Sequence, residues 1–138
     1  MRQLIIGLLA ATVLALSPPA LASLPVQSDF RDQVLYLVMV DRFANGDKSN
    51  DGNADPHNPH AYHGGDLKGL RQKLDYLRDL GVTTLWLTPI NKNQAGPYSG
   101  KYWGYHGYWI QDFDQVDPRF GTEEDLKAVC SRCGARPA

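Results

Sequence analysis

Oxygen-bearing side chains crowd one stretch of the chain. Carboxylates and amides recur at close spacing there, at Asn45, Asp47, Asn50, Asp51 and Asp66. Hard cations such as calcium bind about six to eight oxygens drawn from carboxylates, amides and backbone carbonyls. An EF-hand register starting at Asp47 fails, because its last position is Asn58 rather than a glutamate. The spacing indicates either a calcium site of another geometry or a set of turns built by Asx and Gly residues.

A second stretch is dense in aromatic side chains. Twelve residues contain Tyr98, Tyr102, Trp103, Tyr105, Tyr108 and Trp109. Large rings with polar edges suit the apolar faces of sugars, and Lys101 and His106 can bond hydroxyl groups. Glycines at positions 96, 100, 104 and 107 interrupt the stretch, which favours a loop that contacts a ligand over an aromatic core cluster.

The histidines and cysteines give weaker signals. Pro56 and Pro59 interrupt the run that contains His57, His60 and His63, so these three cannot share a helix face, and zinc or copper is not favoured. Cys130 and Cys133 form a CxxC pair without the second ligand pair that a zinc site needs. A thioredoxin-like redox motif should follow a strand and open a helix, whereas this CxxC pair lies in a tail of Ser, Arg, Gly and Pro. A local disulfide remains an alternative to no role at all.

Regular elements must position these side chains. The continuous apolar run 34–40 is typical of a strand buried on both faces, and the long loop 41–65 follows it. Leucines 67, 70, 74, 77 and 80 predict one amphipathic helix that Asp66 caps and Gly81 ends. A second buried strand is expected over 82–87. Strand, helix and strand make a βαβ unit with neighbouring parallel strands.

The remaining residues are less regular. A second long loop covers 90–108, and a short extended piece is expected over 109–113. Thr122 to Asp125 resemble a capping box, followed by the apolar face of Leu126 and Val129. From Ser131 onward we expect no helix. Two parallel strands alone leave faces and edges uncovered, so this sheet needs further chain to complete it.

Composition narrows the class of protein. The chain has 138 residues and a formal charge of −1, which allows one ordinary domain and argues against a nucleic-acid-binding surface. An apolar segment from Leu4 to Leu16 follows Arg2 and precedes Ala20-Leu21-Ala22, as in a signal peptide cleaved after Ala22. It is too short to span a bilayer. We therefore expect a secreted or periplasmic protein with no membrane attachment after cleavage.

Several motifs, in order, resemble the opening of the α-amylase family of glycoside hydrolases. They cover about residues 34–129, with secreted bacterial α-amylases and cyclodextrin-forming transferases as the most similar members. The motifs run from Asp41 to Asp47, His63 to Gly69, Gly81 to Ile90, Gly104 to Ile110 and Asp117 to Thr122. The resemblance implies an α/β fold, namely an incomplete N-terminal portion of a (β/α)8 TIM barrel with about two βα units and long βα loops.

The resemblance also implies site residues. The implied calcium ligands are Asn45, Asp47, Asn50, Asp51, the Gly64 carbonyl and Asp66. Tyr108 would stack on the sugar beside the scissile bond and His106 would bond one of its hydroxyls, with Tyr105 and Trp103 as further contacts of a starch or maltodextrin-type α-glucan.

The resemblance also implies what this stretch lacks. Retaining hydrolysis needs a carboxylate nucleophile and a carboxylic acid about 5 Å apart, and the family places its Asp, Glu and Asp after later strands. We read Asp112, Asp114, Asp117, Glu123 and Glu124 as structural or solvated and assign no catalytic residue. The expected function is an inactive N-terminal fragment of an enzyme acting on α-1,4-glucans; the alternative is a non-catalytic maltodextrin-binding fragment.

These expectations divide the chain into four parts. Residues 1–22 form the signal peptide, 23–33 an exposed lead-in and 34–129 the barrel portion. Residues 130–138 depart from the family pattern. Our hypothesis for them is a shifted reading frame or a sequencing error in a full-length gene, and the alternative is a genuine short protein.

Overall fold

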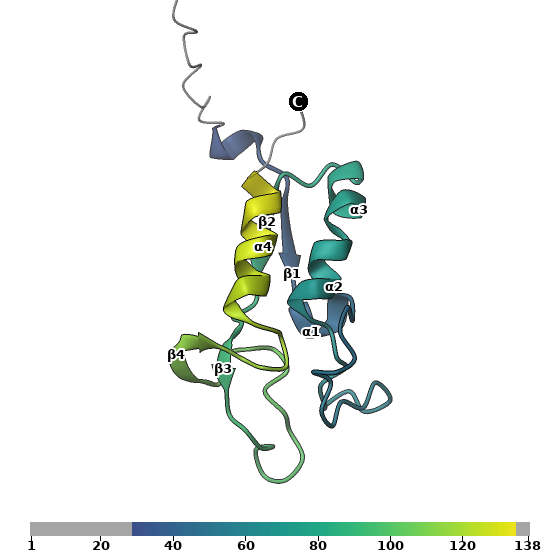
Figure 1. The fold of residues 1–138 in the computed structure, drawn as a ribbon, viewed down its shortest axis with the longest axis vertical. Helices are drawn as coiled ribbons and strands as arrows, with labels where there is room; N and C mark the ends of the chain where they lie inside the picture. Colours follow the sequence, from purple (N-terminus) through teal and green to yellow (C-terminus); the bar gives the residue numbers. More distant parts are fainter. Residues whose placement is uncertain (1–28, 135–138) are drawn as a thin grey trace, which may run out of the picture.

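Two short parallel strands lie at the centre of the structure, a computed structural model that describes residues 29–134 (Figure 1). Strand β1 (Leu35–Val38) pairs with β2 (Thr84–Leu87), and Leu37 lies opposite Trp86. The predicted parallel pair is therefore confirmed, although each strand is shorter than its apolar run. The signal peptide predicted over 1–22 and the last four residues of the tail lie outside the described residues.

The chain between the strands forms two short helices where one was predicted over 67–80. Helix α2 (Leu67–Gln72) and helix α3 (Leu74–Asp79) meet at Lys73, whose φ of −102° and ψ of 5° interrupt the regular helix. The leucine spacing still places four leucines in the core, but Leu80 is 59% exposed, so its assignment to the buried face was wrong. Leu80 lies past the last helical residue, where helical periodicity no longer fixes direction.

Both predicted ends of this helical segment are confirmed. The Asp66 carboxylate accepts a hydrogen bond of 2.6 Å from the Gly69 amide, which satisfies one free donor of the first turn of α2. Gly81 has a φ of +93°, the left-handed conformation that commonly follows a helix.

Five further elements complete the described part of the chain, and three of them, α1, β3 and a short 3₁₀ turn, were not predicted. Helix α1 (Val40–Phe43) takes Val40 out of the predicted strand, and strand β3 (Asn91–Asn93) pairs antiparallel with β4 (Ile110–Val116). β3 was missed because Asn-Lys-Asn has no apolar alternation. A 3₁₀ turn, η1 (Phe30–Asp32), precedes β1 and buries none of its residues.

Helix α4 (Glu123–Gly134) begins as predicted but extends further. Thr122 and Asp125 exchange hydrogen bonds between side chain and backbone, which confirms the capping box. The helix continues through Ser131 and Arg132 to Gly134, where the sequence predicted no helix. Residues 130–133 of this helix are exposed, so this turn needs no apolar period to stay helical.

The helices cover only one face of the strand pair. The core cluster comprises Val38, Val40, Tyr62, Leu67, Leu70, Leu74, Leu77, Phe120 and Val129. On the opposite face Leu35, Leu37 and Trp86 are 45%, 58% and 58% exposed. The prediction of strands buried on both faces was therefore wrong for the described residues, because nothing among them packs against this second face.

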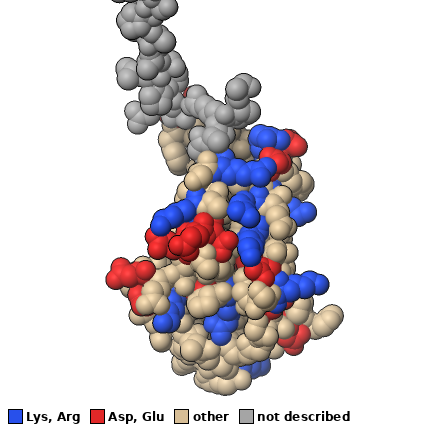
Figure 2. Space-filling view, in the orientation of Figure 1, with Lys and Arg blue, Asp and Glu red and all other residues tan. Residues whose placement is uncertain are grey.

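Both long loops lie at the carboxyl ends of the strands, at the lower end of Figure 1. Charged side chains of both signs are interspersed over the face in Figure 2 rather than gathered into one basic patch. Within residues 29–134, no helix combines the length and apolar character needed to cross a bilayer.

Candidate functional site

The first loop is organised around the buried carboxylate of Asp66, which is 1% exposed. Besides capping α2, this carboxylate accepts hydrogen bonds from the amides of Gly46, at 3.1 Å, and Asp47, at 2.8 Å. A carboxylate with several amide donors fixes the backbone around it. Asp66 therefore ties the loop to the start of α2, and its oxygens already have partners.

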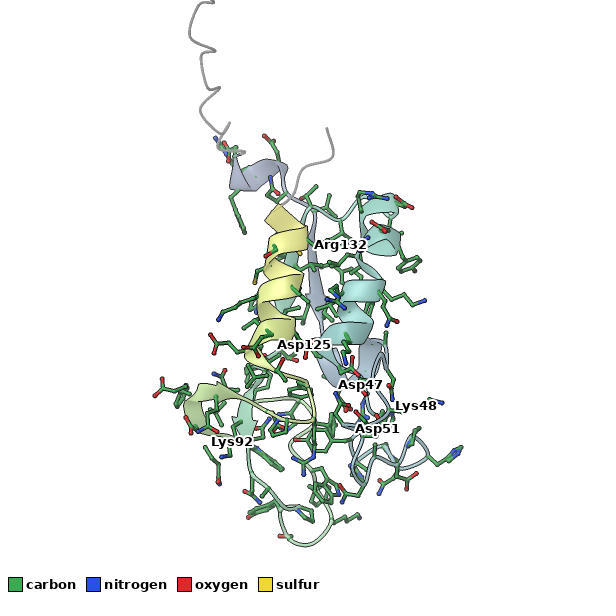
Figure 3. All side chains as sticks on the ribbon, viewed as in Figure 1. Asp47, Lys48, Asp51, Lys92, Asp125 and Arg132 are labelled. Atoms are coloured by element: carbon green, nitrogen blue, oxygen red, sulfur yellow. The ribbon has the colours of Figure 1, made fainter. Side chains whose placement is uncertain are left out.

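Asp47 lies beside this cap, near Asp51 and below the start of α2 (Figure 3). Its Oδ1 accepts from the amide and hydroxyl of Ser49, and its Oδ2 accepts from the Lys68 ammonium. The hydrogen bond from Lys68 is the main reason that the pKa of the Asp47 carboxyl lies well below its usual value. Asp47 is therefore ionised at neutral pH and paired with a cationic side chain.

Three of the predicted metal ligands lie close together, and a fourth carries a buried oxygen without a hydrogen-bond partner. Asn45 Nδ2 lies 2.7 Å from Asp51 Oδ1. The backbone of Gly64 faces both side chains so closely that an added Cβ would lie 2.7 Å from each of those two atoms. Asn50 Oδ1 is buried without a hydrogen-bond partner. Amide, carboxylate and unsatisfied oxygens of this kind suit a hard cation, so these residues fit calcium.

Carboxylate, imidazole and thiol groups are not gathered into one metal cluster. Within the described part of the chain, no three His, Cys, Asp or Glu side chains are placed together to hold a metal ion, and this includes the predicted ligands Asp47, Asp51 and Asp66. His60 packs edge-on against Tyr102, and His63 Nε2 lies 3.1 Å from the Asn58 carbonyl. Cys130 and Cys133 are free thiols exposed on α4. The CxxC pair therefore lies inside a helix, and does not open one after a strand.

In the second loop, His106 and Tyr108 form a stacked pair at the surface. Their ring centroids are 5.8 Å apart with an angle of 25° between the planes, and Tyr108 is 59% exposed. His106 Nδ1 accepts a hydrogen bond of 3.0 Å from the Tyr108 amide, which leaves Nε2 to carry the proton of the neutral ring. Burial lowers the pKa of His106. The pair offers a flat aromatic face beside a neutral hydrogen-bond donor.

The two other predicted sugar contacts are packed inward. Trp103 and Tyr105 both lie against the core cluster, and Trp103 contacts Tyr62 edge-on at 6.1 Å. The Trp103 amide also donates to the His60 carbonyl. Tyr105 still touches His106 edge-on, with centroids 5.4 Å apart. The structure thus joins Tyr105 to the surface pair and gives Trp103 a packing role.

Sequence reasoning missed the residues that connect the two loops. Asp41 is 2% exposed, accepts from the amides of His63 and Gly64, and pairs with Arg42 at 2.8 Å. Burial is the main cause that raises the pKa of the Asp41 carboxyl. The Arg42 guanidinium lies 3.9 Å from the centre of the Tyr105 ring. The available signal was a charged pair placed directly after a buried strand.

A second buried carboxylate supports the aromatic loop from the other side. Asp117, which is fully buried, accepts from the amides of Asn93 and Arg119, each at 2.9 Å. The Arg119 guanidinium lies over the rings of Tyr62 and Trp103. Glu123, by contrast, is solvated and pairs with Lys127 on the exposed surface of α4. Asp117 therefore has a structural role, the one predicted for it, in which its carboxylate holds backbone amides.

Comparison with known proteins gives a consistent picture. A family model described as the catalytic domain of alpha amylase matches residues 37–137. An alpha-amylase of Streptomyces lividans is 55% identical over 84 residues, which cover 59% of this chain and 9% of that protein. A cyclomaltodextrin glucanotransferase of Klebsiella oxytoca is 43% identical over 108 residues, covering 75% of this chain and 16% of that protein.

A solved structure shares the arrangement of elements. The crystal structure of an Anoxybacillus alpha-amylase superposes with a TM-score of 0.68 and 48% identity, and covers 75% of this chain and 21% of its own. The chain therefore spans between about a tenth and a fifth of the length of the proteins it matches.

Proposed function

This chain belongs to the α-amylase family of glycoside hydrolases, and from that premise we propose that it is the N-terminal part of an exported enzyme acting on α-1,4-glucans. The described residues form an N-terminal portion of a (β/α)8 barrel, which confirms the predicted fold class. In such barrels the loops at the carboxyl ends of the strands carry the active site, and both long loops of this chain lie there.

The stacked pair of His106 and Tyr108 carries the glucan proposal. An exposed tyrosine ring gives a sugar an apolar platform, and the adjacent Nε2–H gives one of its hydroxyls a donor. Arg42, beneath Tyr105, and Arg119, beneath Trp103, hold the loop that presents the pair. The observation that one exposed ring and one neutral imidazole are fixed together is what favours a sugar over an ionic ligand.

We propose further that these 138 residues do not hydrolyse glucans by themselves. Retaining chemistry needs two carboxyl groups about 5 Å apart across the scissile bond. The buried carboxylates, Asp41, Asp66 and Asp117, are all engaged by backbone amides. The purified chain should release no reducing sugar from soluble starch, with or without calcium; clear calcium-dependent release would contradict this.

A non-catalytic maltodextrin-binding role is the second candidate, and the same surface pair supports it. Titration of the chain with maltoheptaose, followed by tryptophan fluorescence, tests binding directly. Tyr108→Ala should abolish a saturable signal. Tyr76→Ala is the matched control, because Tyr76 on α3 is 60% exposed and far from the loop in sequence. Equal loss in both variants would mean that the signal does not report this site.

Calcium is the proposed cofactor. Asn45, Asn50, Asp51 and the Gly64 carbonyl would hold the ion, with Asp47 and Asp66 as the remaining ligands; a bound calcium would fix the first loop against α2. The unsatisfied Asn50 Oδ1 is the observation that supports the ion. Calcium should raise the melting temperature and chelator should reverse the rise, whereas an unchanged melting temperature would count against the site.

Export is proposed from residues 1–22, by their signal-peptide pattern. Expression of the full chain in a bacterial host, followed by cell fractionation and N-terminal sequencing, tests it. The expected product begins at Ser23 outside the cytoplasm; an intact N-terminus in the cytoplasm would contradict export.

A further inference from the structure

One lysine occupies an oxygen that the proposed calcium site requires. Lys68 lies on α2, and its ammonium is 2.5 Å from Oδ2 of Asp47 in the first loop. The two side chains are 39% and 25% exposed, so the pair is neither buried nor freely solvated. A lysine at a protein surface usually gains little free energy from an ion pair, because holding its long side chain in one conformation costs entropy.

This pair is held in place from both sides. Asp66 accepts from the Asp47 amide and also caps α2, where Lys68 is the second residue. One buried carboxylate therefore positions the backbone of both partners. Folding of the loop already orders the backbone of both residues, so less conformational entropy is lost when their side chains pair. We therefore expect this ion pair to be stronger than an ordinary surface ion pair.

The other oxygen of Asp47 is also engaged. Oδ1 accepts from both the amide and the hydroxyl of Ser49, and the Lys68 ammonium holds the remaining oxygen, Oδ2. A divalent ion that binds Asp47 must displace the Lys68 ammonium from Oδ2 or bind close to its positive charge.

We propose that Lys68 competes with calcium for Asp47 and thereby sets the affinity of the first loop for the ion and its dependence on ionic strength. This inference rests on the calcium site proposed above. Lys68 acts here as an internal counter-cation that satisfies Asp47 when the metal is absent and weakens the metal when it is present.

Calcium titrations of the full chain by calorimetry test the inference, with Lys68→Gln as the main variant. Its dissociation constant should be about three- to fivefold lower than that of the unmodified chain at low salt, an effect of the size expected when a partly exposed ion pair is removed. Lys68→Arg keeps the positive charge on a side chain of similar length, so this variant should bind calcium with the same affinity as the unmodified chain.

Lys48→Gln is the matched control. Lys48 neighbours Asp47 in the same loop, is exposed, and forms no ion pair within residues 29–134 (Figure 3). Its substitution removes one positive charge without touching Oδ2, so the affinity should change by less than about twofold. In about 0.5 M salt, the difference between Lys68→Gln and the unmodified chain should shrink, because screening weakens a partly exposed pair.

The outcomes separate this inference from the calcium proposal. Binding by the unmodified chain with equal effects of Lys68→Gln and Lys48→Gln would overturn the competition and leave the site standing. Weaker binding by Lys68→Gln would also overturn it, since Lys68 would then position Asp47 for the metal. Binding by Lys68→Gln alone would support competition. If neither the unmodified chain nor any variant binds calcium, the site and the inference both fail.

Discussion

Gly107 lies so close to Pro89 that a Cβ added to it would come 1.8 Å from the Pro89 carbonyl oxygen. Gly107 also has a φ of +86°, a conformation that costs other residues about 1–2 kcal/mol. The contact joins the end of the second strand to the turn between His106 and Tyr108. The placement of the stacked pair of His106 and Tyr108 at the surface therefore depends on the absence of a side chain at Gly107.

Gly107→Ala should lower the free energy of unfolding by about 3 kcal/mol, because backbone strain and the clash with Pro89 add together. Urea denaturation followed by circular dichroism measures it. Gly96→Ala is the control, since a Cβ added to Gly96 would meet no atom within 4 Å and its φ is not in the left-handed region; it should change stability by less than about 0.5 kcal/mol. Similar losses in both variants would contradict the argument.

Asp117→Ala should also destabilise the chain by about 3 kcal/mol. The substitution leaves the buried Asn93 amide unpaired and deprives Arg119 of its carboxylate neighbour at 3.6 Å. Asp114→Ala, at an exposed position of β4, should have little effect on the urea midpoint. A small effect of Asp117→Ala would mean that water replaces the carboxylate without loss.

The stability of the chain should depend on pH through His106. Its folded-state pKa lies below the usual value of 6.5 because of burial, so the unfolded chain takes up a proton first as the pH falls. The contribution of the neutral ring is complete above about pH 6.5 and is lost as the pH falls from there to the folded pKa. Protonation also removes the acceptor for the Tyr108 amide.

Urea midpoints of the unmodified chain and His106→Gln, compared from pH 8 to pH 5, check this expectation. The unmodified chain should lose stability relative to the variant below about pH 6.5. Parallel curves would contradict it, as would an NMR titration that places the His106 pKa at or above 6.5.

Gly64→Ala should weaken calcium binding at least about tenfold, or about 1.4 kcal/mol. Its Cβ would push against both Asn45 and Asp51, at a φ of +88°. Gly52→Ala is the matched control because Gly52 has a φ of +57° but open space around it. The control carries the same kind of backbone strain without the clash, so calorimetry should show a smaller loss; equal losses would assign the effect to strain alone.

Local patterns predicted the parts of the fold that local chemistry determines. The capping role of Asp66, the left-handed Gly81 and the exchange between Thr122 and Asp125 each follow from residue types a few positions apart. The parallel strand pair followed from the alternation of strand and helix.

Elements set by distant contacts were missed. Strand β3 exists because Asn91–Asn93 pairs with β4 and because Asp117 holds the Asn93 amide. Trp103 looked like a surface ring because glycines surround it, yet Tyr62, some forty residues earlier, packs against it. Arg42 and Arg119 support the loop through ring contacts that no sequence period encodes.

The uncovered apolar face of the strand pair β1–β2 affects how the chain interacts with other proteins in a cell. Leu37 and Trp86 lie side by side in solvent, on strands that each keep one unpaired edge within the described residues. Such a surface is what chaperones hold, what proteases sample and what seeds association between copies. Covering this face, by further chain or by a partner, would therefore reduce both proteolysis and association.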